Sequence, residues 1–233
     1  MVEKGLAATR SQAQGMILQG LVQVNEEVII KAGHSFDPGR DVITLKELFP
    51  YVSRGALKLI KALDTFSLSV EGQVVLDIGS STGGFTDVCL SRGARLVYAV
   101  DVGTNQLAYK LRQDKRVVVM EKTNARYLEP AQFDPSPNVA VCDVSFISLK
   151  LIIPVVKKLS IPDFVALIKP QFEVGKEIPG FDGVVKRDEE RELAMARVKE
   201  YAQDAGFVVS GLCESPITGP KGNVEYLIYL KNQ

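Results

Sequence analysis

Two charged residues follow apolar runs directly in the second half of the chain. Asp143 comes after Val139–Cys142, and Lys169 comes after Val165–Ile168. A lysine at the end of a buried strand costs desolvation energy unless a carboxylate compensates its charge. The two residues therefore suit either a structural salt bridge or a site in which the lysine exchanges a proton with a substrate.

Two further charged residues extend this set. Glu225 lies in the segment 219–226, and Lys58 lies in the segment 53–59. A lysine can take the proton of a weakly acidic alcohol only when burial or a second positive charge, such as that of Lys58, favours the neutral amine. Carboxylates at Asp143 and Glu225 would orient that lysine and hold the hydroxyl. The candidate catalytic groups are Lys58, Asp143, Lys169 and Glu225.

A glycine-rich turn follows the apolar run 74–78. The turn, 79–84, lacks the second glycine of a dinucleotide fingerprint and the Gly-Lys-Ser/Thr of a P-loop. Asp101 ends the next apolar run, and its carboxylate can accept both hydroxyls of an adenosine ribose. The pattern resembles the cofactor loop of S-adenosylmethionine methyltransferases. For Asn124, an adenine contact and a plain turn role both stay open. The residues expected to bind the cofactor are Asp77, Gly79, Ser80, Ser81, Gly83, Gly84, Phe85, Asp101, Val102, Asn124 and Asp143.

Alternating strands and helices are needed to position these residues. The expected strands are 74–78, 95–100, 117–120, 139–142, 164–168, 207–212 and 224–230. The expected helices are 53–63, 82–91, 106–112, 149–159 and 188–205. Ser53 is expected to cap the first of these helices and Lys58 to lie away from its apolar side. This order predicts an α/β fold with a doubly wound, mostly parallel sheet. With the resemblance of the cofactor loop, it implies a Rossmann-like class I methyltransferase with a seven-stranded sheet.

The first 48 residues are predicted to form a separate small α+β domain, followed by the larger domain over 53–233. Thr9 or Ser11 can cap a helix there, and 21–25, 27–30 and 41–45 have the pattern of short strands. A unit of this size buries only a small core, so it is predicted to be an accessory module.

The composition argues against several classes of protein. Lys and Arg balance Asp and Glu at a net charge of zero, so contact with a nucleic acid would depend on local clusters of basic residues. Cys89, Cys142 and Cys213 lack C-x-x-C spacing, which suggests buried, reduced thiols, and a single histidine, His34, argues against a metal site. Since no signal peptide or membrane-spanning run is found, we expect a cytoplasmic protein.

Several blocks of sequence resemble one family. SRGALKL, DIGSSTGGFTD, VDVGTNQLAYKL, CDVSFISL, KPQFEVG and GPKGNVEYL occur in the order found in the TlyA (hemolysin A-like) ribosomal RNA methyltransferases. The four candidate catalytic residues match the Lys-Asp-Lys-Glu tetrad of FtsJ-like RNA 2′-O-methyltransferases. The resemblance implies S-adenosylmethionine as cofactor, ribosomal RNA or ribosomal subunits as partners, and methylation of cytidine ribose.

The first domain is similar to the αL-type RNA-binding motif that opens this family. The similarity lies in Arg10–Gln14, in 17–25 and in 31–33. It implies contacts to RNA backbone and shape. The residues expected to make RNA contacts are Arg10, Gln14, Gln19, Lys31 and Arg54.

Four other functions compete with this one. An amino-group methyltransferase would carry prolines after the fourth strand, and Asp143–Phe146 has none. A base C5-methyltransferase needs a cysteine in the site, but strand alternation directs Cys142 away from Asp143. A membrane-acting cytolysin and a non-catalytic RNA-binding protein stay as alternatives.

Overall fold

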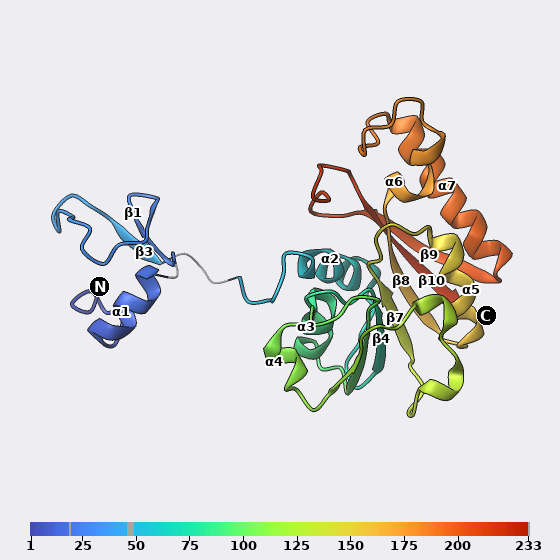
Figure 1. Cartoon of the computed structure of the whole chain (residues 1–233), viewed down its shortest axis with the longest axis horizontal. Coiled ribbons are helices and arrows are strands. Elements are labelled where there is room, and N and C mark those ends of the chain that lie inside the picture. The colour runs from blue at the N-terminus through green and yellow to red at the C-terminus, as the bar shows by residue number, and fades with distance from the viewer. Residues whose placement is uncertain (19, 46–48, 233) are drawn as a thin grey trace. The chain divides into compact units, whose positions relative to one another are not determined.

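The computed structural model describes residues 1–18, 20–45 and 49–232 and divides the chain into two compact units, Met1–Pro50 and Tyr51–Gln233 (Figure 1). The N-terminal unit contains α1 (Arg10–Leu18) and an antiparallel sheet in the order β2-β1-β3. Its strands are β1 (Val22–Val24), β2 (Glu27–Ile29) and β3 (Ile43–Leu45). Of the two capping candidates, Thr9 makes the bond: its Oγ1 accepts from Gln12 N at 3.1 Å.

In the described part of the C-terminal unit, the strands form a seven-stranded sheet in the order β6-β5-β4-β7-β8-β10-β9. Among the described strands of this sheet, β10 alone runs in the direction opposite to the others, so the predicted mostly parallel sheet is confirmed. The strands are β4 (Val74–Ile78), β5 (Leu96–Val100), β6 (Val117–Met120), β7 (Val139–Cys142), β8 (Asp163–Ile168), β9 (Phe207–Glu214) and β10 (Tyr226–Asn232).

The α-helices of this unit are α2 (Ala56–Phe66), α3 (Gly84–Ser91), α4 (Tyr109–Arg112), α5 (Ile153–Lys158), α6 (Pro170–Glu173) and α7 (Asp188–Asp204). Short 3-10 turns are η1 (Ala125–Tyr127), η2 (Pro130–Gln132), η3 (Leu149–Leu151) and η4 (Gly175–Glu177). The predicted helix 149–159 is wrong as one element. Pro154 lies in the first turn of α5, where its missing N–H is tolerated, and the chain before it forms η3 instead. Within the described ranges, no helix has the length and apolar character needed to cross a membrane.

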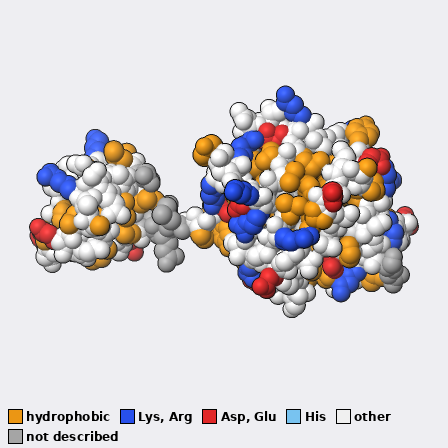
Figure 2. Space-filling model, turned by 90° about the horizontal axis from the view of Figure 1, so that it is seen from below, with side chains coloured by type: hydrophobic (Ala, Val, Ile, Leu, Met, Phe, Trp, Pro, Cys, Tyr) orange, Lys and Arg blue, Asp and Glu red, His pale blue; other side chains and the backbone are white. Residues whose placement is uncertain are grey.

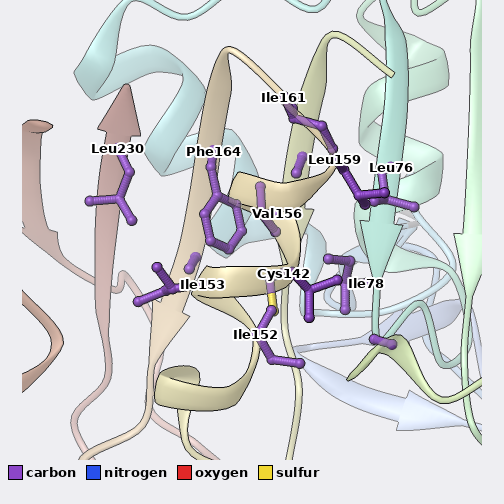
Figure 3. Close-up of a cluster of buried hydrophobic side chains, with 14 of the residues drawn as sticks. Leu76, Ile78, Cys142, Ile152, Ile153, Val156, Leu159, Ile161, Phe164 and Leu230 are labelled. Atoms are coloured by element: carbon purple, nitrogen blue, oxygen red, sulfur yellow. The ribbon is translucent and has the colours of Figure 1, made fainter. Parts of the chain in front are cut away.

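Helices cover both faces of the sheet (Figure 1). Alternate strand residues face opposite sides, so Val75 and Val141 pack under α2 and α3 while Leu76 and Cys142 pack under α5. Figure 3 shows the hydrophobic cluster on the α5 side of the sheet, in which Cys142 lies beside Ile152. Cys142 is buried, as predicted.

Two predictions about α2 are wrong. Its N-cap is Gly55, without a side-chain cap, so Ser53 does not cap it. Lys58 is 6 % exposed, on the buried face of the helix with Leu59 and Ala62. Burial of this amine is compensated by a carboxylate from a distant segment, a contact that the spacing of apolar residues within the helix cannot reveal.

The prediction of buried thiols holds for two of the three cysteines. Cys89 and Cys142 are fully buried, whereas Cys213 on β9 is only partly buried. All three are free thiols. Cys213 lies in the sheet's edge strand, which has a neighbouring strand on one side only, and this leaves its side chain partly open.

Candidate active site

The glycine-rich loop and the ends of β5, β7 and β8 meet at the carboxyl edge of the sheet, where open α/β sheets bind ligands. A cleft of about 900 Å³ lies along this edge. Several residues predicted to bind cofactor line it, namely Gly79, Ser81, Asp101, Val102, Asn124 and Asp143. The other end of the cleft is lined by residues that follow β7 and β8 and by the side chains of Arg197 and Tyr201.

The four candidate catalytic residues meet beside the cleft in a chain of alternating charges. Lys169 Nζ lies 2.6 Å from Asp143 Oδ1, and Lys58 Nζ lies 3.7 Å from Asp143 Oδ2. Lys58 Nζ also donates to Glu225 Oε2 at 2.6 Å. Lys58, Lys169 and Glu225 are buried, whereas the Asp143 side chain is 21 % exposed. The two buried cations are thus balanced by two carboxylates, and Asp143 carries this chain of contacts to the cleft wall.

Ser145 also belongs to this group of side chains, although it is not among the residues predicted from the sequence. Lys169 Nζ donates to Ser145 Oγ at 2.8 Å, and Ser145 is exposed and lines the cleft. Lys169 therefore holds a hydroxyl oxygen at the cleft wall, which is the contact that a substrate hydroxyl would need. In the sequence, Ser145 is marked by its position two residues after Asp143. Because the strand has ended there, the alternation of side chains along a strand no longer predicts where the Ser145 side chain points.

The glycine-rich loop passes close to the end of β7. Gly79 has φ +82°, and a Cβ at this position would lie 2.8 Å from the carbonyl oxygen of Asp143. Both the backbone angle and the close approach require glycine here. The loop therefore packs directly against the end of β7, and Gly79 lines the cleft beside Asp143.

The Asp101 carboxylate faces the same cleft and is held by backbone donors. Its Oδ2 accepts from Ser81 N at 2.8 Å, and its Oδ1 accepts from Gly103 N at 2.7 Å. A carboxylate has about four lone-pair positions, so two backbone bonds leave room for hydroxyl donors. Asp101 is thus both a brace for the loop and a potential acceptor for a ribose.

Five residues of the predicted cofactor set do not border the cleft: Asp77, Ser80, Gly83, Gly84 and Phe85. Ser80, Gly83 and Gly84 belong to the loop itself, and all five residues are buried. A Cβ on Gly83, at φ +98°, would lie 2.8 Å from Leu107 Cδ1, so this glycine serves the packing of the segment that leads into α4. A Cβ on Gly84 would lie 3.2 Å from Ala56 N, so it lets α2 approach α3. These residues therefore support the loop through their packing in the protein interior.

Asp77 is fully buried below the loop. Its Oδ2 accepts from Thr86 Oγ1 at 2.6 Å, while Oδ1 has no hydrogen-bond partner among the described residues. Burial raises the pKa of Asp77 to about 7, and the nearby negative charge of Asp143 adds to this.

Asn124 lines the cleft and also caps η1, its Oδ1 accepting from Arg126 N at 3.1 Å. Both roles considered for Asn124 are therefore compatible with its position.

Aromatic side chains stand beside Asp143. Phe146 has φ +67° and is 91 % exposed, and its ring centroid lies 5.3 Å from that of Phe172. A backbone angle in the left-handed region is unusual for a bulky residue and holds the ring out at the cleft. Behind it, Glu173 accepts from Leu149 N at 2.9 Å, and burial raises the pKa of its carboxyl group.

The residues predicted to contact RNA fall in both units. Arg10, Gln14 and Lys31 line one pocket of about 240 Å³ on the N-terminal unit. Arg54 is exposed just before α2, and Gln19 lies outside the described residues. The part of the chain that the structure describes contains no group of three His, Cys, Asp or Glu side chains arranged to hold a metal ion.

Comparison with known proteins agrees with this geometry. The FtsJ-like methyltransferase family matches residues 51–232, and the S4 domain matches residues 1–42. A Bacillus subtilis protein named YqxC is 49 % identical over 99 % of this chain and 83 % of its own length. The Mycobacterium tuberculosis protein named 16S/23S rRNA (cytidine-2'-O)-methyltransferase TlyA is 43 % identical over 100 % of this chain and 88 % of its own.

Two further relatives carry another name. Hemolysin A of Brachyspira hyodysenteriae is 44 % identical over 97 % of this chain and 95 % of its own. A solved structure from Streptococcus thermophilus, also named as a hemolysin, is 50 % identical with a TM-score of 0.78, covering 99 % of this chain and 86 % of that one. The chain belongs to the FtsJ-like methyltransferase family, in the TlyA-related group that carries an S4 domain ahead of the catalytic domain.

Proposed function

We propose that this protein is an S-adenosylmethionine-dependent methyltransferase that modifies the ribose 2′-hydroxyl of cytidine in ribosomal RNA. The relatives named as TlyA act on this substrate, and the present chain covers most of their length. A ribosomal substrate implies that the protein works in the cytoplasm. The observation that carries the proposal is the unbroken chain of contacts from Glu225 through Lys58 and Asp143, which lines the cleft, to Lys169.

The loop side of the cleft fits S-adenosylmethionine. Asp101 would accept the ribose hydroxyls with its remaining lone pairs, and Val102 and Asn124 would border the adenine. Gly79 holds the loop close to Asp143, and both residues line the cleft where the amino-acid part of the cofactor would lie. When bound, the cofactor supplies an electrophilic methyl group on a positively charged sulfur.

Lys169 is the residue that handles the substrate hydroxyl. It already donates to the hydroxyl of Ser145, and we expect a ribose 2′-hydroxyl to take this position. Asp143 orients the amine of Lys169 through one carboxylate oxygen, and Lys58 contacts the other oxygen of the same carboxylate. Lys169 is therefore the group placed to accept the proton that the hydroxyl loses when the methyl group is transferred.

The surroundings of the cleft suit an unpaired nucleotide. Phe146 offers an exposed ring on which a base can stack, supported by Phe172. One face of the C-terminal unit shows a hydrophobic area with Lys and Arg side chains beside it (Figure 2). Because the net charge is zero, RNA affinity rests on such local groups and on the S4 domain.

The position of the transferred methyl group tests the proposal. Ribosomal RNA from cells that lack the protein would be incubated with the purified protein and S-adenosylmethionine, and ribose methylation would be mapped by resistance to alkaline cleavage. We expect new 2′-O-methyl groups on cytidine. Methylation of a base, or no transfer to any ribosomal RNA, would contradict the proposal.

A further inference from the structure

Asn223 joins two segments that are far apart in the sequence. It lies in the loop between β9 and β10 and is 2 % exposed. Its Oδ1 accepts from Val185 N at 2.9 Å, and its Nδ2 donates to the carbonyl oxygen of Gly183 at 2.8 Å. Its own carbonyl oxygen accepts from Gly219 N at 2.9 Å. The oxygen and the nitrogen of the Asn223 side-chain amide thus both bond to the backbone at residues 183–185, while the backbone carbonyl of Asn223 bonds to Gly219 in its own loop.

The segment that Asn223 holds is the strap 178–187 between η4 and α7. Val185, in this strap, is 1 % exposed and packs with Val174 and Ala194 in a small separate cluster. Val174 comes directly after α6, which itself begins directly after Lys169. The side chain of Asn223 therefore connects the segment that carries Lys169 with the loop that carries Glu225.

The sheet alone does not hold these two residues in register. The last pair of the β10·β8 ladder is Tyr226 with Ile168, so Glu225 and Lys169 are each one residue beyond it. On the β9 side, Ser215 N donates to the Glu225 carbonyl at 2.9 Å. On the β8 side, the strand pairing between the described residues stops at Tyr226. Beyond it, the Asn223 side chain is hydrogen-bonded to the strap 178–187.

The carboxylate of Glu225 has little room to move. A Cβ on Gly219 would lie 2.6 Å from Glu225 Oε1, so the loop backbone packs directly against this oxygen. The other oxygen, Oε2, receives Lys58 Nζ at 2.6 Å. A displacement of the loop 219–224 would therefore move Glu225, and with it Lys58, away from Asp143.

We propose that Asn223 is a positioning residue for the methyl transfer. By joining the strap to the loop 219–224, it fixes Glu225 and Lys58 with respect to Lys169 and Asp143. This inference rests on the proposed function, since it assigns Asn223 an effect only through the four candidate catalytic residues.

A double-mutant cycle on the full chain tests the inference. The four proteins are the wild type, Asn223→Ala, Glu225→Ala and the double variant, and kcat for methylation of ribosomal RNA is measured for each. We expect Asn223→Ala to lower kcat about 10- to 100-fold, because a displacement of about 1 Å in a catalytic group has an effect of this order. Since Asn223 acts through Glu225, the double variant should be no slower than Glu225→Ala.

A matched asparagine separates positioning from loss of stability. Asn138 also holds a backbone amide with its side chain, accepting from Val74 N at 3.3 Å, but at the opposite end of the sheet. Asn138→Ala should lower the melting temperature without lowering kcat per folded molecule. In hydrogen-exchange measurements, Asn223→Ala should speed exchange in the strap 178–187, and Asn138→Ala should not. Asn223→Asp keeps the acceptor for Val185 but loses the donor to Gly183, so it should be impaired as well.

Two results would overturn the inference while leaving the proposed function intact. One is a wild-type kcat for Asn223→Ala when Glu225→Ala is slow. The other is a fully multiplicative loss in the double variant. If Glu225→Ala itself kept the wild-type rate, the proposed function and the positioning role would both be wrong.

Discussion

Asp77 and Lys58 are both buried, but their charges are compensated in different ways. Lys58 contacts the carboxylates of Glu225 and Asp143. Asp77 contacts no cation but accepts hydrogen bonds from Thr86, and its Oδ1 has no hydrogen-bond partner among the described residues. An uncompensated carboxylate in the interior binds its proton more tightly, which raises the pKa of Asp77 to about 7.

This raised pKa predicts a pH-dependent stability. In the unfolded chain Asp77 titrates near 3.8, so between about pH 4 and 7 the folded state holds a proton that the unfolded state has lost. The free energy of unfolding should therefore fall as the pH rises, by at most about 1.4 kcal/mol per pH unit from this group, and level off above pH 7. Melting temperatures at pH 5 and pH 8 would show it.

Asp77→Asn should remove this part of the pH dependence, because an amide does not titrate. Asp204→Asn, at the exposed end of α7, serves as the control and should keep the wild-type slope. If the wild type and Asp77→Asn lost equal stability between the two pH values, Asp77 would not be the group responsible.

At the scale of elements, the strands were more predictable than the helices. Each expected strand of the large sheet is present within about two residues, because buried parallel strands appear in sequence as continuous apolar runs. The expected helix 106–112 shortens to α4, and 149–159 breaks before Pro154. These short helices owe their limits to local turns and proline, which the apolar period does not record.

The site was predictable to the extent that its residues follow strands. Asp143, Lys169 and Asp101 come directly after apolar runs, so their common edge follows from the fold. Lys58 was expected on the polar side of its helix, whereas it is buried. Its burial depends on the contact with Glu225, which the local sequence of the helix does not reveal. Asn223 was not found at all, since its partners are in a strap that has no regular pattern.

The glycine-rich loop gives a prediction at this scale. Gly79→Ala should abolish the rise in melting temperature that S-adenosylmethionine produces, because its Cβ would press on the Asp143 carbonyl and displace the loop. That rise reflects binding to the folded state, about 2.7 kcal/mol at a ligand concentration of 100 Kd.

Gly72→Ala is the matched control. Gly72 has φ +69°, similar to the +82° of Gly79, but a Cβ at this position would meet no atom within 4 Å. This variant should lose about 1–2 kcal/mol of stability from backbone strain and keep the full cofactor response. Equal cofactor responses in the two variants would show that the loop does not bind the cofactor as proposed.

At the scale of the whole molecule, the chain consists of two units, and we propose that the first recognises RNA while the second carries out the methyl transfer. The S4 match covers residues 1–42 and the methyltransferase match 51–232, and each unit has its own sheet. Basic residues of the first unit are therefore expected to contribute to RNA affinity, whereas the charges of the cleft act on the transfer step.

A charge reversal in the first unit tests this division. Arg10→Glu combined with Lys31→Glu should raise KM for ribosomal RNA and reduce its salt dependence while kcat stays near the wild-type value. Both side chains are exposed and border the same pocket, whereas Lys4 is exposed outside it. Lys4→Glu should therefore have a smaller effect. An unchanged KM in the double variant would show that this pocket does not meet RNA.

The measurement that tests the central claim most directly is the methylation rate of Lys169→Ala per folded molecule, with cofactor binding measured on the same sample. We expect a rate about 10²–10⁴-fold below the wild type, because positioned proton transfer contributes this much. Cofactor binding should persist, since the loop and Asp101 provide it. Lys169→Arg should fail too, because a guanidinium cannot give up its proton. A Lys169→Ala protein that is merely less stable, yet methylates ribosomal RNA at the wild-type rate, would contradict the account.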